Sequence, residues 1–399
     1  MFELGRQGIG VTQKHRGYLT VGGVDREEII KYRQKSLSDL MRKEGIHALL
    51  VNSNENVTYV TGSNTERFYT RAYALFLADI QDVVRLSADI PLTKAYDCGC
   101  YKEVRLSAYH DKFNAEAVKK VIEDYKLTEA IIGLGPGVRY AVYDSIVREL
   151  PKVKFVNASK ILSSAKMLKS SEEMKIVREA ATIAETGMEA ALLAAKANRT
   201  EREVKTAATV TMKAQGAERT HLGSCWVASG DGTAILRRYE SERIIRNGEL
   251  VIIDGGCRYG GFYSELARTK IVGKPKPEQR DIYRTACRAL QEIVKALKPG
   301  TDIQHIHKVS RDVMKEAGYE KYADPMIGHG IGVDIHQPPY IGEDTSGEIK
   351  AGMALCIKPG IYLHDKPEVG GVRLEDMVYI SEEGPEILTK TRYDDELLG

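Results

Sequence analysis

Hydrophobic and polar positions in the first part of the chain switch between two kinds of pattern. Short apolar runs, rich in β-branched residues, predict buried strands at 48–51, 73–78, 82–86, 130–134 and 153–156. Apolar residues at helical spacing predict helices at 25–45, 114–125 and 140–149. Strands that alternate with helices are typical of a small α/β domain, which we expect over residues 1–165.

Longer amphipathic helices dominate the remainder, residues 166–399. The segment 170–173 reads Ser-Ser-Glu-Glu, a capping-box pattern, and apolar residues follow at steps of three and four up to Leu192. Further helices are predicted at 201–215, 277–297 and 303–317, and strands at 224–228, 250–254, 262–273, 353–357 and 372–380. We expect an α+β domain in which helices cover the outer face of an antiparallel-rich sheet.

Composition excludes several classes of protein. The 399 residues are 43% hydrophobic and 29% charged, which suits a globular protein with two domain cores. A net charge of +2 gives no reason to expect a nucleic-acid partner. No apolar run approaches the roughly 18 residues of a membrane span, and no signal core opens the chain. Six scattered cysteines fit reduced core thiols, so we expect a cytoplasmic protein.

Four residues of metal-ligand type stand out in the second domain. Asp254 ends the apolar run at 251–253, and Glu265, His329 and Glu375 follow in apolar or glycine-flanked segments. A charge at the end of a buried strand is costly unless it is paired or does chemistry. Carboxylate and imidazole ligands suit Mn, Fe, Co or Zn.

In order and spacing these residues resemble the catalytic domain of the creatinase, prolidase, aminopeptidase P and methionine aminopeptidase superfamily. The resemblance implies a pita-bread fold over 166–399 and a creatinase/prolidase-type domain over 1–165. Metallopeptidases of this superfamily hold two metals on Asp, Asp, His, Glu and Glu. Asp254, His329 and Glu375 match three of these positions. Glu265 falls at the second Asp, and Lys358 falls at the first Glu.

Lys358 is the decisive departure from the family pattern. A protonated lysine cannot ligate a metal, and it is two charge units more positive than a glutamate. Near a second dication this difference costs several kcal/mol. We therefore expect one divalent metal at most (Mn, Co, Zn or Fe), or none. Glu265 keeps a carboxylate but adds a methylene, so it is either a ligand or the ion-pair partner of Lys358.

A third departure is Arg237, which stands about where the family carries a catalytic His. A guanidinium cannot shuttle protons near pH 7, but it can hold a substrate carboxylate. His336 matches the second family His and is expected to act as an acid or to stabilise an oxyanion. His329 is also expected to face the substrate, while Tyr362 and Arg373 would position it.

A loop of the first domain, residues 65–71, combines cations with aromatic residues. It resembles the creatinase-like branch, whose N-terminal domain lends an Arg and a Phe to the partner subunit's pocket. The resemblance assigns that role to Arg67 and Phe68 and implies a homodimer. The alternative is a solvated loop.

Three functions remain open. The favoured one is an Xaa-Pro peptidase or prolidase-type hydrolase of a dipeptide or related small molecule, with at most one metal on Asp254, His329, Glu375 and Glu265. The second is a metal-free C–N hydrolase of the creatinase kind, in which Lys358 replaces the metal charge. The third is a non-catalytic homologue that binds a small molecule.

Overall fold

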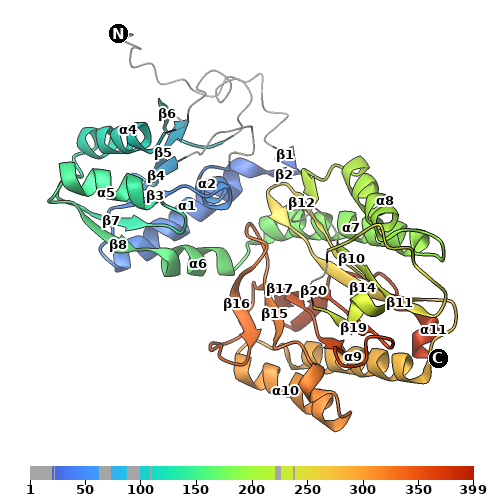
Figure 1. Cartoon of the computed structure of the whole chain (residues 1–399). Coiled ribbons are helices and arrows are strands. Elements are labelled where there is room, and N and C mark those ends of the chain that lie inside the picture. Colours follow the sequence, from blue (N-terminus) through green and yellow to red (C-terminus); the bar gives the residue numbers. More distant parts are fainter. Residues whose placement is uncertain are drawn as a thin grey trace. The chain divides into compact units, whose positions relative to one another are not determined.

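The computed structural model describes residues 20–21, 23–62, 73–87, 99–107, 110–220, 226–236 and 239–399. The chain divides into two compact units, Met1–Lys166 and Met167–Gly399 (Figure 1). Three predicted substrate-binding residues, Arg67, Phe68 and Arg237, lie outside the described residues. In the described part of the chain, no helix has the length and apolar character that a membrane crossing needs.

The first unit is built on a mixed sheet with the strand order β6-β5-β4-β3-β7-β8. Its elements are β1 (Thr20–Val21), β2 (Val24–Asp25), α1 (Arg26–Lys43), β3 (Ala48–Val51), α2 (Asn54–Thr61), β4 (Tyr73–Leu77), β5 (Asp82–Ser87), β6 (Glu103–Leu106), α4 (Asp111–Asp124), β7 (Ile131–Leu134), α5 (Tyr140–Glu149), β8 (Lys154–Asn157) and α6 (Ser159–Met167). The central strand β3 pairs antiparallel with β4 and parallel with β7. The α/β prediction is confirmed.

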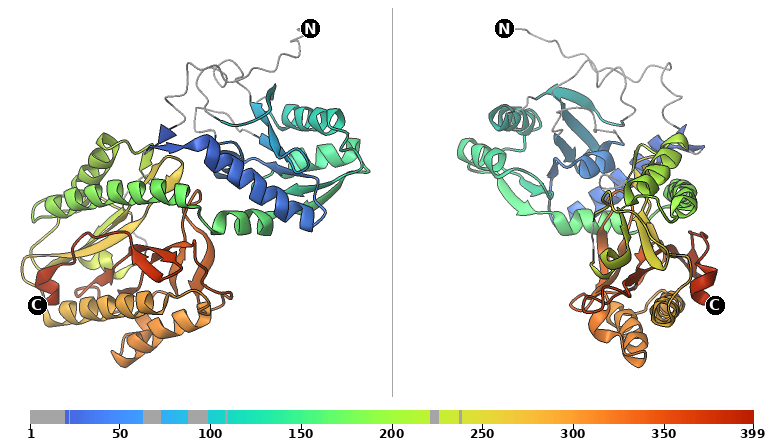
Figure 2. Two further views of the ribbon diagram at one scale, coloured as in Figure 1. Left: turned by 180° about the vertical axis from the view of Figure 1, so that it is seen from behind. Right: turned by 45° about the vertical axis from the view of Figure 1, so that its right-hand side comes forward.

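Alternating apolar side chains give this sheet two covered faces. Leu50, Leu75 and Val84 belong to the core under α4 and α5. Leu49 and Phe76, their neighbours along the strands, are equally buried and point the other way. Helices α1 and α2 pack against each other across the sheet from α4 and α5 (Figure 2).

In the second unit, strands lie between helices α7 and α8 on one side and α9 and α10 on the other (Figures 1 and 2). The helices are α7 (Ser171–Ala194), α8 (Glu201–Ala214), α9 (Pro277–Ala296), α10 (Ile303–Glu316) and α11 (Asp395–Leu398), with the 3-10 helices η3 (Gly230–Ala234) and η4 (Glu320–Tyr322). The capping box that opens α7 is confirmed: the Ser170 hydroxyl accepts from the Glu173 N–H, and the Glu173 carboxylate accepts from the Ser170 N–H.

The strands of this unit pair antiparallel, as predicted. They are β9 (Arg219–Thr220), β10 (Trp226–Ser229), β11 (Glu249–Gly255), β12 (Cys257–Tyr259), β13 (Phe262–Tyr263), β14 (Leu266–Val272), β15 (Met326–Gly330), β16 (Gln337–Gly342), β17 (Ala354–Ile357), β18 (Gly360–Tyr362), β19 (Gly371–Arg373), β20 (Asp376–Ser381) and β21 (Gly384–Ile387). One sheet has the order β10-β11-β14 and another the order β16-β15-β17-β20-β21. This is the antiparallel-rich pita-bread architecture expected from the sequence.

Two strands that the sequence predicts as continuous are interrupted. The run at 262–273 is β13 and β14 with a break at Ser264 and Glu265, and the run at 372–380 is β19 and β20 with a break at Leu374 and Glu375. The second break pairs with β14 just beyond the first break, because Ala267 and Glu375 exchange backbone hydrogen bonds of 3.2 and 3.0 Å. Apolar periodicity could not reveal these interruptions, since the flanking residues remain buried.

Candidate active site

Both interruptions place a carboxylate in the interior of the second unit. Glu265 precedes β14 and Glu375 precedes β20, and both side chains are buried. Asp254, near the end of β11, and His329, on β15, are buried as well. Segments more than 100 residues apart in the chain therefore converge on one site, as the sequence predicted.

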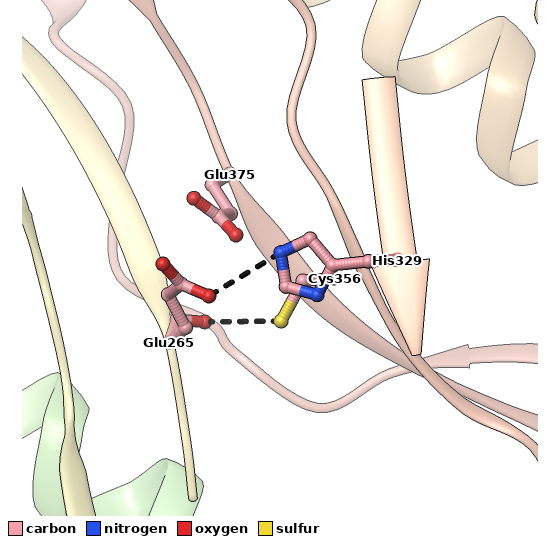
Figure 3. A group of neighbouring side chains, drawn as sticks. All are labelled: Glu265, His329, Cys356 and Glu375. Carbon is pink, nitrogen blue, oxygen red and sulfur yellow. Dashed lines mark hydrogen bonds and ion pairs between the residues drawn. The ribbon is translucent and has the colours of Figure 1, made fainter. Parts of the chain in front are cut away.

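A compact group of possible ligands forms within this site. Glu265, His329, Cys356 and Glu375 each offer one ligand atom, and these atoms all lie within 4.8 Å of one another. Figure 3 shows the Glu265 carboxylate turned toward the His329 ring, with a distance of 3.4 Å between Oε2 and Nε2. The Cys356 thiol lies beside both residues.

Several polar atoms of this group have no hydrogen-bond partner in the described part of the chain. They are Glu265 Oε2, His329 Nε2 and both carboxylate oxygens of Glu375. The other nitrogen of His329, Nδ1, lies 3.1 Å from the Gly330 carbonyl oxygen and can donate a hydrogen to it. That tautomer leaves the Nε2 lone pair facing the Glu265 carboxylate. Facing lone pairs of this kind fit a cation between them, so the residues suit a divalent metal.

Burial and like charges perturb these groups. Burial, followed by the negative charges of Glu375 and Asp254, raises the pKa of Glu265 well above its usual value. Burial and the charge of Asp254 also raise the pKa of Glu375. Burial, followed by the positive charge of Lys358, lowers the pKa of His329 well below its usual value. The imidazole is therefore held neutral, the form that ligates metals.

Arg373 links the carboxylates on the other side of the site. Its Nε lies 2.6 Å from Asp254 Oδ2, one terminal nitrogen lies 3.3 Å from Asp324 Oδ2, and the other lies 3.7 Å from Glu375 Oε2. It also donates a hydrogen bond of 3.1 Å to the Tyr362 hydroxyl. Burial raises the pKa of Tyr362 to about 12, so its phenol stays protonated. Arg373 thus joins Tyr362 to the carboxylates, and the expected role of both residues in positioning the substrate stays a prediction.

The alternative of an ion pair between Glu265 and Lys358 is wrong. Glu265 turns instead toward two imidazoles, and its Oε2 lies 3.4 Å from His329 Nε2 and 3.8 Å from His336 Nε2. Among the residues that the structure describes, no carboxylate oxygen lies within 4.0 Å of the Lys358 ammonium. Lys358 is nevertheless buried, and its charge acts on Glu265, Glu375 and His329.

His336 stands at the solvent side of the group. Its side chain is 39% exposed, whereas Glu265 beside it is 5% exposed. Its ring packs edge-on against His329 with a centroid distance of 4.3 Å. This position makes His336 the imidazole that a molecule entering from solvent can reach.

Main-chain contacts fix the positions of the two carboxylates. Arg268 is buried and donates to the carbonyl oxygen of Glu375 at 2.8 Å and to Asp376 Oδ1 at 2.7 Å. Gly256 faces the other break, and a Cβ at this position would lie 1.8 Å from the carbonyl oxygen of Ser264. A side chain there would displace the segment that bears Glu265.

Two residues of the site escaped the sequence interpretation. Cys356 had been grouped with the core thiols, although it stands two residues before Lys358 and so faces the same side of an extended chain. Asp324 precedes β15 without any motif, and only the fold brings it to Arg373.

Comparison with known proteins gives consistent results for both units. Residues 175–382 match the model of metallopeptidase family M24, and residues 33–167 match that of the creatinase/prolidase N-terminal domain. An Xaa-Pro dipeptidase of Pyrococcus horikoshii is 29% identical over 366 residues, covering 91% of this chain and 98% of the relative. An Xaa-Pro dipeptidase of Pyrococcus furiosus is 32% identical over 72% of this chain and 82% of the relative.

A solved structure extends the likeness to three dimensions. The Xaa-Pro dipeptidase from Bacillus anthracis superimposes with a TM-score of 0.80 at 27% identity, covering 91% of this chain and 98% of that one. Both units therefore have counterparts in one type of two-domain protein.

Proposed function

Because the chain belongs to metallopeptidase family M24 and is a prolidase-type peptidase, we propose that it cleaves Xaa-Pro dipeptides with one divalent metal ion. Glu265, His329 and Glu375 would hold the ion, with Asp254 beside them. The relatives named Xaa-Pro dipeptidase support the substrate class. The charge of the buried site supports the number of ions.

The charge balance carries the one-metal proposal. Four buried carboxylates (Asp254, Glu265, Asp324 and Glu375) face two buried cations (Arg373 and Lys358), which gives a formal charge of −2. Uncompensated buried charge is costly, and one dication would neutralise this site. A glutamate in place of Lys358 would make the formal charge −4, which suits two dications. A lysine in place of the glutamate therefore removes two units of negative charge, which is the charge that one dication would balance.

The side chains have separate roles in this proposal. When bound, the ion supplies Lewis-acid chemistry, making water a stronger acid and polarising a carbonyl group. Glu375, whose carboxylate oxygens have no hydrogen-bond partner, would accept the proton of the attacking water. His336 at the solvent side would donate a hydrogen bond to the oxygen of the scissile carbonyl. The Lys358 ammonium would stabilise the negative charge of the tetrahedral intermediate.

Substrate selection rests on residues outside the described part of the chain. Arg237 would hold the C-terminal carboxylate of the dipeptide through paired N–H donors. Arg67 and Phe68 would reach the site of a partner subunit in a homodimer. These three roles, the homodimer and a cytoplasmic location stay predictions.

The function is tested by measuring amino-acid release from Leu-Pro and Met-Pro, with Leu-Ala and Met-Ala as matched substrates. Chelator-treated protein would be supplied with increasing amounts of Mn, Co or Zn. We expect hydrolysis of the proline dipeptides only, and saturation at one metal ion per chain. Glu375→Gln should abolish turnover while the protein stays folded. Equal cleavage of the alanine dipeptides would contradict the Xaa-Pro assignment.

The two buried cations also support a second candidate, a metal-independent C–N hydrolase. In that case Lys358 and Arg373 together would provide the positive charge that stabilises the oxyanion. The same assay separates the two candidates, because turnover that survives complete chelation would favour the metal-free reaction.

A further inference from the structure

We propose that Cys356 is a ligand of the metal ion, so that the ion is held by imidazole, carboxylate and thiolate donors and zinc or cobalt is preferred to manganese. This inference rests on the proposed single metal ion. It adds a sulfur ligand beside His329 to a site whose other ligands are carboxylates.

The register of the strands places the Cys356 thiol beside the other metal-binding atoms. Cys356 on β17 lies directly opposite His329 on β15 in an antiparallel pair. Side chains at directly opposite positions project from the same face of the sheet. On its other side, β17 pairs with β20, which begins immediately after Glu375. The thiol therefore lies between the imidazole and the segment that bears the Glu375 carboxylate.

The distances suit a ligand set that closes slightly around an ion. The four donor atoms lie within 4.8 Å of one another, and Glu265 Oε2 and His329 Nε2 are 3.4 Å apart. Donors around zinc, at bond lengths of about 2.0–2.3 Å, are separated by roughly 3.3–3.8 Å in a tetrahedral arrangement, and the ion would become five-coordinate when it also binds the water molecule. One pair already has this separation, and no other pair has to close by more than about 1.5 Å.

The neighbouring atoms indicate a ligand rather than an ordinary core thiol. Among the residues that the structure describes, the Cys356 Sγ has one hydrogen-bond contact, a long one of 3.9 Å to the carbonyl oxygen of Glu265. Four atoms beside it could bind a metal and have no hydrogen-bond partner among the described residues: Glu265 Oε2, His329 Nε2 and both oxygens of Glu375. All three residues are more than nine-tenths buried. Buried unpartnered donors cost stability unless a cation satisfies them.

Donor chemistry then selects the ion. Thiolate and imidazole ligands favour zinc and cobalt, whereas manganese prefers oxygen ligands. Burial, followed by the negative charges of Glu375 and Glu265, raises the pKa of the Cys356 thiol well above its usual value, so the ion would have to displace the thiol proton when it binds.

Cobalt spectroscopy tests this inference directly. Co(II) would be titrated into chelator-treated wild type, Cys356→Ser and Cys287→Ser, where Cys287 is a buried thiol in the apolar core of α9. We expect wild type and Cys287→Ser to develop a near-ultraviolet thiolate-to-cobalt charge-transfer band that saturates at one equivalent. Cys356→Ser should lack the band. Its zinc affinity should fall by about tenfold or more, as for other changes to metal sites, while its manganese affinity changes little.

Each outcome has a defined meaning. One equivalent of cobalt bound by wild type without a charge-transfer band would overturn the role of Cys356 and leave the one-metal peptidase intact. Failure of wild type to retain any cobalt would overturn both proposals. If Cys356→Ser did not fold, the band in wild type and in Cys287→Ser would still decide the question.

Discussion

Replacing Lys358 by glutamate should convert the site from one metal ion to two. The side chain is buried, and among the described residues it forms no ion pair that the change would break. The new carboxylate would enter a site that already contains Asp254, Glu265 and Glu375. Its formal charge would then be −4, which two dications balance.

Coulomb's law gives the size of the effect. At a separation of about 5 Å and an effective dielectric constant of about 20, an ammonium repels a dication by about 7 kcal/mol, and a carboxylate attracts it by the same amount. If relaxation and hydration leave only one fifth of this difference, about 2.7 kcal/mol remains. That energy corresponds to a roughly 100-fold lower dissociation constant for the second ion.

Elemental analysis after saturation with Mn or Zn and desalting provides the measurement. Wild type should retain one ion per chain, and Lys358→Glu should retain two. Lys358→Glu both removes the positive charge and adds a ligand. Lys358→Met separates these two effects, because it removes the positive charge without adding a ligand. Lys350→Glu makes the same change of charge at an exposed position and should behave as wild type.

Retention of one ion by Lys358→Glu, with unchanged affinity, would refute the reasoning. Electrostatic exclusion by the lysine would then not be the reason for a single ion. Two ions in wild type would refute it as well, since the buried ammonium would have to tolerate a dication beside it.

Three further predictions concern the scaffold of the site. Arg268→Met should lower the free energy of unfolding by about 3–5 kcal/mol in urea titrations, because it leaves Asp376 buried without its cationic partner, and a loss below 1 kcal/mol would contradict this. Gly256→Ala should cost about 3 kcal/mol in the same assay and weaken metal binding, because its methyl group would meet the Ser264 carbonyl. Burial lowers the pKa of Lys169 to about 8, so the folded state binds fewer protons than the unfolded state above that pH. The stability of wild type relative to Lys169→Met should therefore rise by about 2 kcal/mol between pH 8 and pH 10, and a constant difference would contradict it.

The sequence predicted the two-domain fold because its signals are local. The capping box at Ser170 and the apolar spacing that follows it determine α7, whatever the remainder of the chain does. The strand at 48–51 was likewise predicted with its observed bounds, since a short apolar run between polar segments has few alternatives. Residue order and spacing also singled out, by resemblance, Glu265, His329 and Glu375, which the structure places close together.

The sequence could not predict how the side chains of the site are oriented toward one another. The sequence left Glu265 as either a ligand or the ion-pair partner of Lys358, and the break before β14 turns it toward His329 and His336. The position of Cys356 opposite His329 follows from the register of β15 against β17, which no local pattern encodes. Asp324 reaches Arg373 only through tertiary packing.

The backbone pairing of Ala267 with Glu375 has a consequence for how such a site can change. The two carboxylate-bearing segments are held by N–H and carbonyl groups that every residue type except proline provides. Side chains at 265 and 375 can therefore be exchanged without loss of the bonds that hold these two breaks together. In such a scaffold, the stability of the fold does not depend on which reactive side chains the site carries. During evolution, a metal-binding side chain at such a site can be replaced by a cationic one, or an oxygen ligand by a sulfur ligand, while the fold is kept. The chemistry of the site can then change without a change of fold.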